Sequence, residues 1–179
     1  MKVVLAETAG FCFGVDRAVN MVEELLTDGK KVATLGPIIH NPQLVEDLGK
    51  RGARIVESPD DVADDEVLVL RSHGVARCVV QKAAELGLTV ADATCPFVAK
   101  IHKIVAAAGE QGRTVLIAGD AHHKEVEGLI GHCTGKFFTF NSEEDLVILQ
   151  KNDEIDVDGL KINWKSLKLL KRSVHTTFP

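Results

Sequence analysis

The sequence lacks any excess of positive charge. Its 179 residues contain 21 Lys and Arg against 26 Asp and Glu, which gives a formal net charge of -5 and a pI near 5.8. Proteins that bind nucleic acid through a broad surface carry a basic face, so this balance argues against that class. An anionic small molecule would instead need a local pocket of donor groups.

Long apolar segments are also missing. The N-terminal region has a short apolar run, Val3 to Ala6, which ends at Glu7. We therefore expect no secretory signal, and no run reaches the length that a membrane-spanning helix requires. A hydrophobic content of 45% with 26% charged residues is typical of a globular protein. These features predict a cytoplasmic protein without a membrane partner.

Cysteine is scarce and unclustered. The four cysteines stand at positions 12, 78, 95 and 133, without the tight spacing of a disulfide framework. In a cytoplasmic setting this pattern favours free thiols or metal ligands. We expect Cys78 and Cys133 to belong to the core, because each lies within or just after a predicted amphipathic helix.

The sequence does contain a regular alternation of short apolar strands and amphipathic helices. The strands have apolar residues on both faces, which is typical of a parallel sheet covered by helices, so the fold class is α/β. Residues 1–95 and 96–179 are expected to form two small lobes, because the segments around Cys12 and Cys95 share one order of strand, thiol and helix. The predicted strands cover residues 2–8, 31–35, 54–57, 66–70, 88–91, 114–118 and 137–140.

Five predicted strand-to-helix turns carry a thiol or an imidazole, and parallel strands place such turns at one edge of a sheet. We therefore interpret the five side chains as one site. A thiol at a helix N-terminus is favoured as thiolate by the helix dipole. Taken singly, Cys12 could fill a tight turn between glycines, and each histidine could be a solvent-facing loop residue. The five residues are Cys12, His40, His73, Cys95 and His123.

These residue types allow two kinds of chemistry. Two thiolates are too few for a cuboidal iron–sulfur cluster, but they could complete a zinc site with two of the imidazoles. The imidazole N–H groups, beside helix N-termini, could instead bind a phosphate group. Glu125 and Glu127 follow His123 two residues apart, so only one of them can face the site and carry a proton.

Five motifs together resemble a known family, the bacterial 4-hydroxy-3-methylbut-2-enyl diphosphate reductases. The likeness runs from Met1 to about Glu144 and resumes at Thr176 to Phe178. It implies a three-lobed, trefoil-like α/β fold and the last step of the non-mevalonate route to isoprenoids. The motifs, in the family's order and spacing, are GFCFGVDRAV, IIHNPQLVEDL, RSHGV, DATCP and HHKEVEG.

The resemblance also implies a cofactor and a reaction. Three thiolates would hold a [4Fe–4S] cluster, and Cys12 and Cys95 match two of them. The hydroxyl of the allylic diphosphate substrate would leave as water, giving isopentenyl and dimethylallyl diphosphates. Reduced ferredoxin or flavodoxin would supply the electrons.

The remaining site residues implied by the resemblance contact the substrate. Glu125 matches the family's proton donor, and the others match ligand-contacting residues, with the histidines mainly at the diphosphate end. These substrate-contacting residues are His40, His73, His123, Thr176 and Thr177.

The sequence departs from that family in several places. Members continue into a third lobe with the third cluster cysteine, whereas this chain ends at Pro179, so we expect that lobe to be absent and turnover to be impaired. The segment from Lys161 to Arg172 is basic and holds the only Trp, where the family has an apolar strand. Lys124 and His175 replace a common proline and glutamine. The alternative function is a non-catalytic remnant that binds a metal or a diphosphate.

Overall fold

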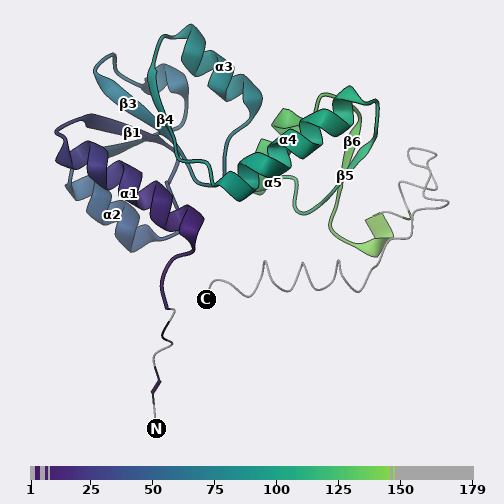
Figure 1. Ribbon diagram of the computed structural model, residues 1–179, viewed down its shortest axis with the longest axis horizontal. Coiled ribbons are helices and arrows are strands. Elements are labelled where there is room, and N and C mark those ends of the chain that lie inside the picture. Colours follow the sequence, from purple (N-terminus) through teal and green to yellow (C-terminus); the bar gives the residue numbers. More distant parts are fainter. Residues whose placement is uncertain (1–2, 5–6, 8, 146, 148–179) are drawn as a thin grey trace.

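Two parallel sheets organise the chain in the computed structural model, which describes residues 3–4, 7, 9–145 and 147 (Figure 1). One sheet has the strand order β2-β1-β3-β4, and the other pairs β5 with β6. All of these pairs are parallel. The strands are β1 Lys31–Leu35, β2 Ala53–Val56, β3 Glu66–Leu70, β4 Thr89–Asp92, β5 Val115–Ala118 and β6 Phe137–Phe140.

Helices follow most of the strands and cover the sheets, which confirms the predicted α/β class with parallel sheets and flanking helices. Asn41 caps α2 by accepting a hydrogen bond from the Leu44 N–H at 3.1 Å, and Pro42 opens that helix. The helices are α1 Phe13–Thr27, α2 Pro42–Lys50, α3 Arg77–Glu85, α4 Pro96–Glu110 and α5 Lys124–His132, with a 3-10 helix at Pro59–Asp61.

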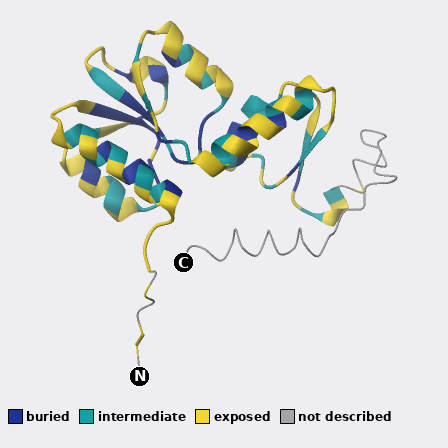
Figure 2. Cartoon of the chain, viewed as in Figure 1, coloured by how far each residue is buried: buried dark blue, intermediate teal, exposed yellow. Residues whose placement is uncertain are grey.

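The core of the larger sheet is split between its two faces (Figure 2). Val69 of β3 joins a buried cluster with residues of α1, whereas its neighbours Leu68 and Leu70 join a second cluster with Ala83 of α3. Successive strand residues point to opposite faces, so this alternation is what a sheet covered on both sides requires. Burial of each such side chain stabilises the fold by about 1.5–3 kcal/mol. The packing fixes β1 and β3 side by side and so places the loops that follow them together.

The strand predicted over residues 2–8 is wrong where the structure can be described. Val3 and Val4 are not in a strand and are 80% and 75% exposed, and Glu7 lies in a turn. A strand needs a neighbour to satisfy its backbone hydrogen bonds, and no described strand pairs with this segment. Cys12 therefore precedes α1 without a described strand before it.

The second sheet lies beyond β4, where α4 leads away from the larger sheet (Figure 1). Helices α4 and α5 pack against each other, and α5 also contacts α3. The lobe boundary between residues 95 and 96 stays a prediction. Thr176, Thr177, His175 and the segment from Lys161 to Arg172 lie outside the described residues.

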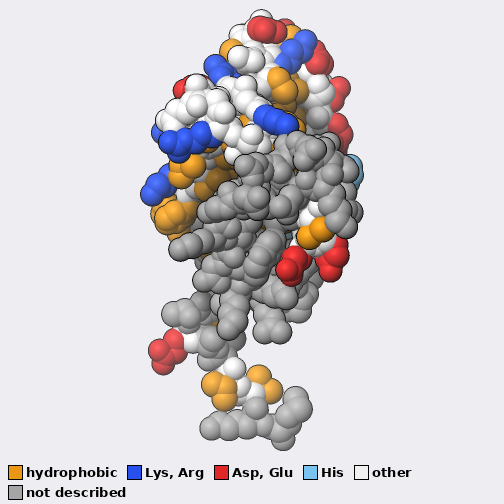
Figure 3. All heavy atoms as spheres, turned by 90° about the vertical axis from the view of Figure 1, so that its right-hand side faces the viewer, with side chains coloured by type: hydrophobic (Ala, Val, Ile, Leu, Met, Phe, Trp, Pro, Cys, Tyr) orange, Lys and Arg blue, Asp and Glu red, His pale blue; other side chains and the backbone are white. Residues whose placement is uncertain are grey.

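Basic and acidic side chains are mixed on the described part of the face in Figure 3. Within the described ranges, no helix has both the length and the apolar character to cross a membrane.

Candidate functional site

Three histidines from different strand-to-helix loops meet at one place. His40 follows β1, His73 follows β3, and His123 follows β5 of the other sheet. The ring centroids of His40 and His73 are 4.6 Å apart, and that of His123 lies 6.2 Å from His40 and 6.4 Å from His73. The structure thus brings together the three imidazoles that the sequence grouped, and it draws them from both sheets.

His73 is the least exposed of the three. Burial lowers the pKa of His73 to about 4, and the neighbouring His40, His123 and Arg71 act in the same direction. The ring is therefore neutral at neutral pH and can donate an N–H without carrying a charge. Its Nδ1 is buried and has no hydrogen-bond partner. A bound anion would relieve the crowding of positive groups around this ring.

His123 caps helix α5. Its Nδ1 accepts a hydrogen bond from the Glu125 N–H at 3.3 Å, so the ring proton of the neutral form lies on Nε2. That N–H remains available to a ligand. The N-terminal end of α5 adds its own partial positive charge beside it, which favours an anion.

Glu125 and Glu127, both in the first turn of α5, have different surroundings. The Lys124 ammonium lies 2.9 Å from a Glu127 carboxylate oxygen and holds that side chain in an ion pair. Among the described ion pairs none involves Glu125, which is half-buried. Glu127 also lines the cavity beside His40 and His73, so the assignment of the proton carrier to Glu125 stays a prediction.

A cavity of about 440 Å³ opens beside His40 and His73. Arg71 lines it and donates from Nη1 to the Leu35 carbonyl at 3.4 Å, while its Nε has no partner. Burial lowers the pKa of Arg71, and Glu127 and Glu57 partly oppose this. Arg71 was not predicted as a site residue, although it stands two residues before His73 in the RSHGV motif.

The two candidate thiols both precede helices. Cys12 is the N-cap residue of α1 and Cys95 that of α4. A Cβ added at Gly14 would lie only 2.6 Å from the Cys95 sulfur, so that thiol packs against the first turn of the helix that Cys12 begins. Arg17 also ties the two segments together, donating to the Thr94 and Asp92 carbonyls at 3.1 Å each.

The sequence also allowed a zinc site made of the two thiols and two of the imidazoles. The described residues include no set of three or more His, Cys, Asp or Glu side chains placed to hold one metal ion, so the zinc alternative finds no support there. The bare backbone at Gly14 leaves the Cys95 sulfur free of any covering side chain on that side. Soft thiolates at helix N-termini are the donors that iron–sulfur clusters use, and Cys12 and Cys95 fit that role.

The prediction that Cys78 belongs to the core is wrong. Its side chain is exposed, because α3 turns Val79 and Ala83 toward the sheet and leaves Cys78 on the outer side. Cys133 is half-buried, and its thiol donates to the Gly135 carbonyl at 3.5 Å. His102 of α4 is buried.

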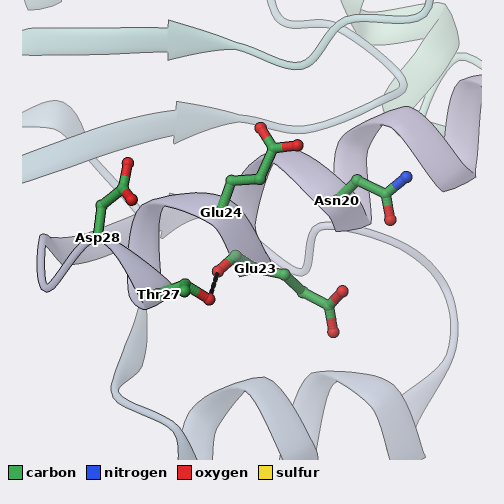
Figure 4. A pocket seen from close by; sticks show the side chains of 5 residues that line it. All are labelled: Asn20, Glu23, Glu24, Thr27 and Asp28. Atoms are coloured by element: carbon green, nitrogen blue, oxygen red, sulfur yellow. Dashed lines mark hydrogen bonds between the residues drawn. The ribbon is translucent and has the colours of Figure 1, made fainter.

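A second hollow lies along α1, away from the predicted site residues (Figure 4). It has a volume of about 480 Å³ and carries three acidic side chains. The Thr27 hydroxyl donates to the Glu23 carbonyl at 2.7 Å. Carboxylates repel an anionic ligand, so this hollow is no candidate for the diphosphate. Its lining residues are Asn20, Glu23, Glu24, Thr27 and Asp28.

Known proteins with similar sequences carry one activity in their names. A family model described as LytB protein matches residues 3–170. The 4-hydroxy-3-methylbut-2-enyl diphosphate reductase of Geotalea uraniireducens (strain Rf4) is 41% identical over 157 residues, which cover 88% of this chain and 55% of that protein. The enzyme of that name from Thermoanaerobacter sp. (strain X514) is 42% identical over 149 residues, which cover 81% of this chain and 52% of the relative.

Solved structures of diphosphate reductases are also similar to this chain. The structure of (E)-4-hydroxy-3-methyl-but-2-enyl diphosphate reductase, the terminal enzyme of the non-mevalonate pathway, matches with a TM-score of 0.71 and 38% identity over 83% of this chain and 54% of that one. The Plasmodium falciparum E-1-hydroxy-2-methyl-but-2-enyl-4-diphosphate reductase matches with a TM-score of 0.75 and 30% identity, covering 79% of this chain and 45% of that one. The chain spans about half the length of the curated relatives it matches. Because the family model extends over residues 3–170, the chain belongs to the LytB protein family.

Proposed function

We propose that this chain takes part in the reductive dehydroxylation of 4-hydroxy-3-methylbut-2-enyl diphosphate to isopentenyl and dimethylallyl diphosphates. The observation that carries the proposal is the meeting of His40, His73 and His123 at one place, from loops of both sheets. The names of the relatives supply the substrate.

The three imidazoles would bind the diphosphate. The neutral His73 donates an N–H without charge. His123 offers its Nε2–H, and the N-terminus of α5 adds an attractive field. Negative charge beside His73 opposes the effects that lower its pKa, so binding of the diphosphate raises that pKa. Arg71 lines the adjoining cavity and strengthens the positive field there.

The reaction breaks the carbon–oxygen bond of the substrate hydroxyl. Two electrons enter, one proton joins the leaving hydroxyl to form water, and a second proton joins the allylic carbon. Glu125, two residues after His123 in the first turn of α5, is the proposed donor of one of these protons. A reduced ferredoxin or flavodoxin is the proposed source of the electrons.

Cys12 and Cys95 would hold two corners of an iron–sulfur cluster. When bound, such a cluster supplies electrons and a Lewis-acidic iron for the hydroxyl oxygen. The residues of the chain hold these thiols in place, since Arg17 bonds the loop before Cys95 and Gly14 lets the Cys95 sulfur approach α1. Both thiols stand at helix N-caps, Cys12 at that of α1 and Cys95 at that of α4.

The test is anaerobic reconstitution of this chain with iron and sulfide, followed by turnover with dithionite and a viologen mediator. Cys95→Ser should abolish the visible absorbance of the cluster, whereas Cys78→Ser should retain it because Cys78 is exposed on α3. Glu125→Gln should keep the cluster and lower the turnover rate by about 100-fold, the usual contribution of a general acid.

The matched control for the acid is Glu110→Gln, which changes an exposed glutamate at the end of α4 and should leave turnover unchanged. Equal turnover by the Glu125→Gln and Glu110→Gln variants would contradict the proton-donor assignment. Cluster loss in Cys78→Ser with retention in Cys95→Ser would contradict the ligand assignment. Because we expect turnover of this chain to be impaired, binding of the diphosphate without turnover would favour the alternative of a non-catalytic binding protein.

A further inference from the structure

The loop that presents His73 is held from behind by residues of α4 and α5. Gly74 has φ +73°, and a Cβ there would lie 2.5 Å from Cε1 of His102. Gly128 of α5 faces the same ring and the His73 carbonyl, at 3.3 and 3.7 Å from where its Cβ would be. This close approach leaves the loop little room to move toward α4, because such a displacement brings its backbone against the His102 ring.

His102 belongs to a stacked pair of imidazoles. Its ring lies 4.1 Å from that of His132 between centroids, at an interplanar angle of 19°. His102 is only 6% exposed, and its Nε2 has no hydrogen-bond partner. The stack therefore fixes the His132 ring by contact from α4 rather than by hydrogen bonds to His102.

His132 reaches the His73 loop directly. Its Nε2 lies 3.1 Å from the Val75 carbonyl oxygen. A carbonyl only accepts, so the proton of His132 lies on Nε2. Val75 is 4% exposed, and a hydrogen bond in such a dry place constrains the backbone more than one at the surface does.

We propose that His132, oriented by its stack on His102, is a positioning residue that fixes the Val75 carbonyl and thereby the placement of the His73 imidazole toward its anionic ligand. His102 lies about two helical turns after Cys95 on α4, so the pair also connects the helix that begins at the thiol with the imidazole loop. The role of the ligand in this inference rests on the function proposed above.

If His132 only filled space, any side chain of similar size could replace it. A hydrogen-bonding role requires an N–H at the position of Nε2. Glutamine carries its amide nitrogen the same number of bonds from Cβ as histidine carries Nε2, whereas asparagine falls one bond short and leucine has no donor. Comparing His132→Gln with His132→Asn thus separates positioning from packing.

The experiment measures the imidazole NMR resonances of His73 in ligand-free protein and the dissociation constant of inorganic pyrophosphate. His132→Asn and His132→Leu should shift the His73 resonances and weaken pyrophosphate binding by about fivefold, the effect of one ordinary hydrogen bond. His132→Gln should retain the resonances and bind within about twofold of the parent. The control is His122→Gln, in an exposed side chain outside the stack, which should change neither readout.

Identical His73 resonances and pyrophosphate affinities in the Asn and Gln variants would overturn the inference. If His132→Leu fails to fold, the comparison of His132→Asn with His132→Gln still tests the positioning role of His132. Failure of the parent chain to bind pyrophosphate would contradict the proposed function, whereas the ligand-free His73 resonances would still test the positioning role.

Discussion

Gly14 lies where a side chain would meet a thiol. A Cβ there would come within 2.6 Å of the Cys95 sulfur and 2.9 Å of its Cβ. Gly14→Ala must therefore displace Cys95 or the first turn of α1, and we expect a loss of about 1–3 kcal/mol in the free energy of unfolding. Urea denaturation measures this loss, and the alkylation rate of Cys95 reports its displacement.

Gly49 supplies the matched control for this substitution. It also lies inside a helix, α2, but a Cβ there would meet nothing within 4 Å. Gly49→Ala should therefore stabilise the protein by about 0.5–1 kcal/mol, the ordinary gain for alanine over glycine in a helix. Equal effects of the two substitutions would show that Cys95 does not depend on the space at Gly14.

His73 and His102 make the stability of the fold depend on pH. Burial lowers the pKa of each from 6.5 to about 4. The unfolded chain binds these protons below about pH 6.5 and the folded chain only below about pH 4, so stability is full above 6.5 and falls as the pH falls toward 4. The expected slope is at most about 1.4 kcal/mol per pH unit for each histidine.

Urea denaturation between about pH 5 and pH 7.5 measures that slope. The Glu66 carboxyl, whose pKa is held below its ordinary value by hydrogen bonding to Arg54, titrates below this window. His73→Gln should reduce the slope, whereas His122→Gln, in an exposed side chain, should leave it unchanged. An unaltered slope in His73→Gln would mean that His73 is not neutralised by burial.

At the scale of elements, Arg17 joins α1 to the loop between β4 and α4. Its guanidinium donates to the Thr94 and Asp92 carbonyls at 3.1 Å each. Arg17→Lys retains the charge but loses the fork that reaches both oxygens, so we expect a loss of about 1–2 kcal/mol in stability and faster alkylation of Cys95. Arg113→Lys, at an exposed position, is the control. An unchanged alkylation rate of Cys95 in Arg17→Lys would show that the position of the thiol does not depend on the Arg17 hydrogen bonds.

The elements from residue 31 onward could be predicted from the sequence, because local signals there agree with the fold. The bounds predicted for the apolar strands β1 and β3 are those of the structure. The meeting of His40 and His73 follows from the pairing of parallel strands β1 and β3, whose carboxyl ends share one edge.

Features that depend on contacts between distant segments escaped prediction. The apolar run at Val3 and Val4 predicts a strand, but a strand forms only where a second strand pairs with it, and the sequence does not reveal that partner. The stack of His102 on His132 depends on how α4 packs against α5. The sequence also did not reveal the ion pair between Lys124 and Glu127.

At the scale of the whole molecule, the three imidazoles bring together loops of both sheets, and we propose that one ligand contacts all three. His40 and His73 belong to loops of the larger sheet, and His123 caps the helix that follows β5. A diphosphate that contacts all three should slow amide hydrogen exchange in both α3 and α5. At a ligand concentration of 100 times the dissociation constant, the stabilisation should be about 2.7 kcal/mol.

His123→Asn tests this coupling without removing the helix cap. Asparagine is a favoured N-cap residue and can accept the hydrogen bond from the Glu125 N–H, but it lacks the imidazole Nε2–H. We expect ligand-free stability within about 1 kcal/mol of the parent, pyrophosphate binding weakened by about fivefold, and ligand-induced protection retained in α3 but lost from the first turn of α5. His123→Ala removes the cap as well and should cost a further 1 kcal/mol or so, about the value of an N-cap. If pyrophosphate still slowed amide hydrogen exchange fully in α5 of His123→Asn, its effect on the second sheet would not depend on the His123 imidazole. The three imidazoles would then not act as one site.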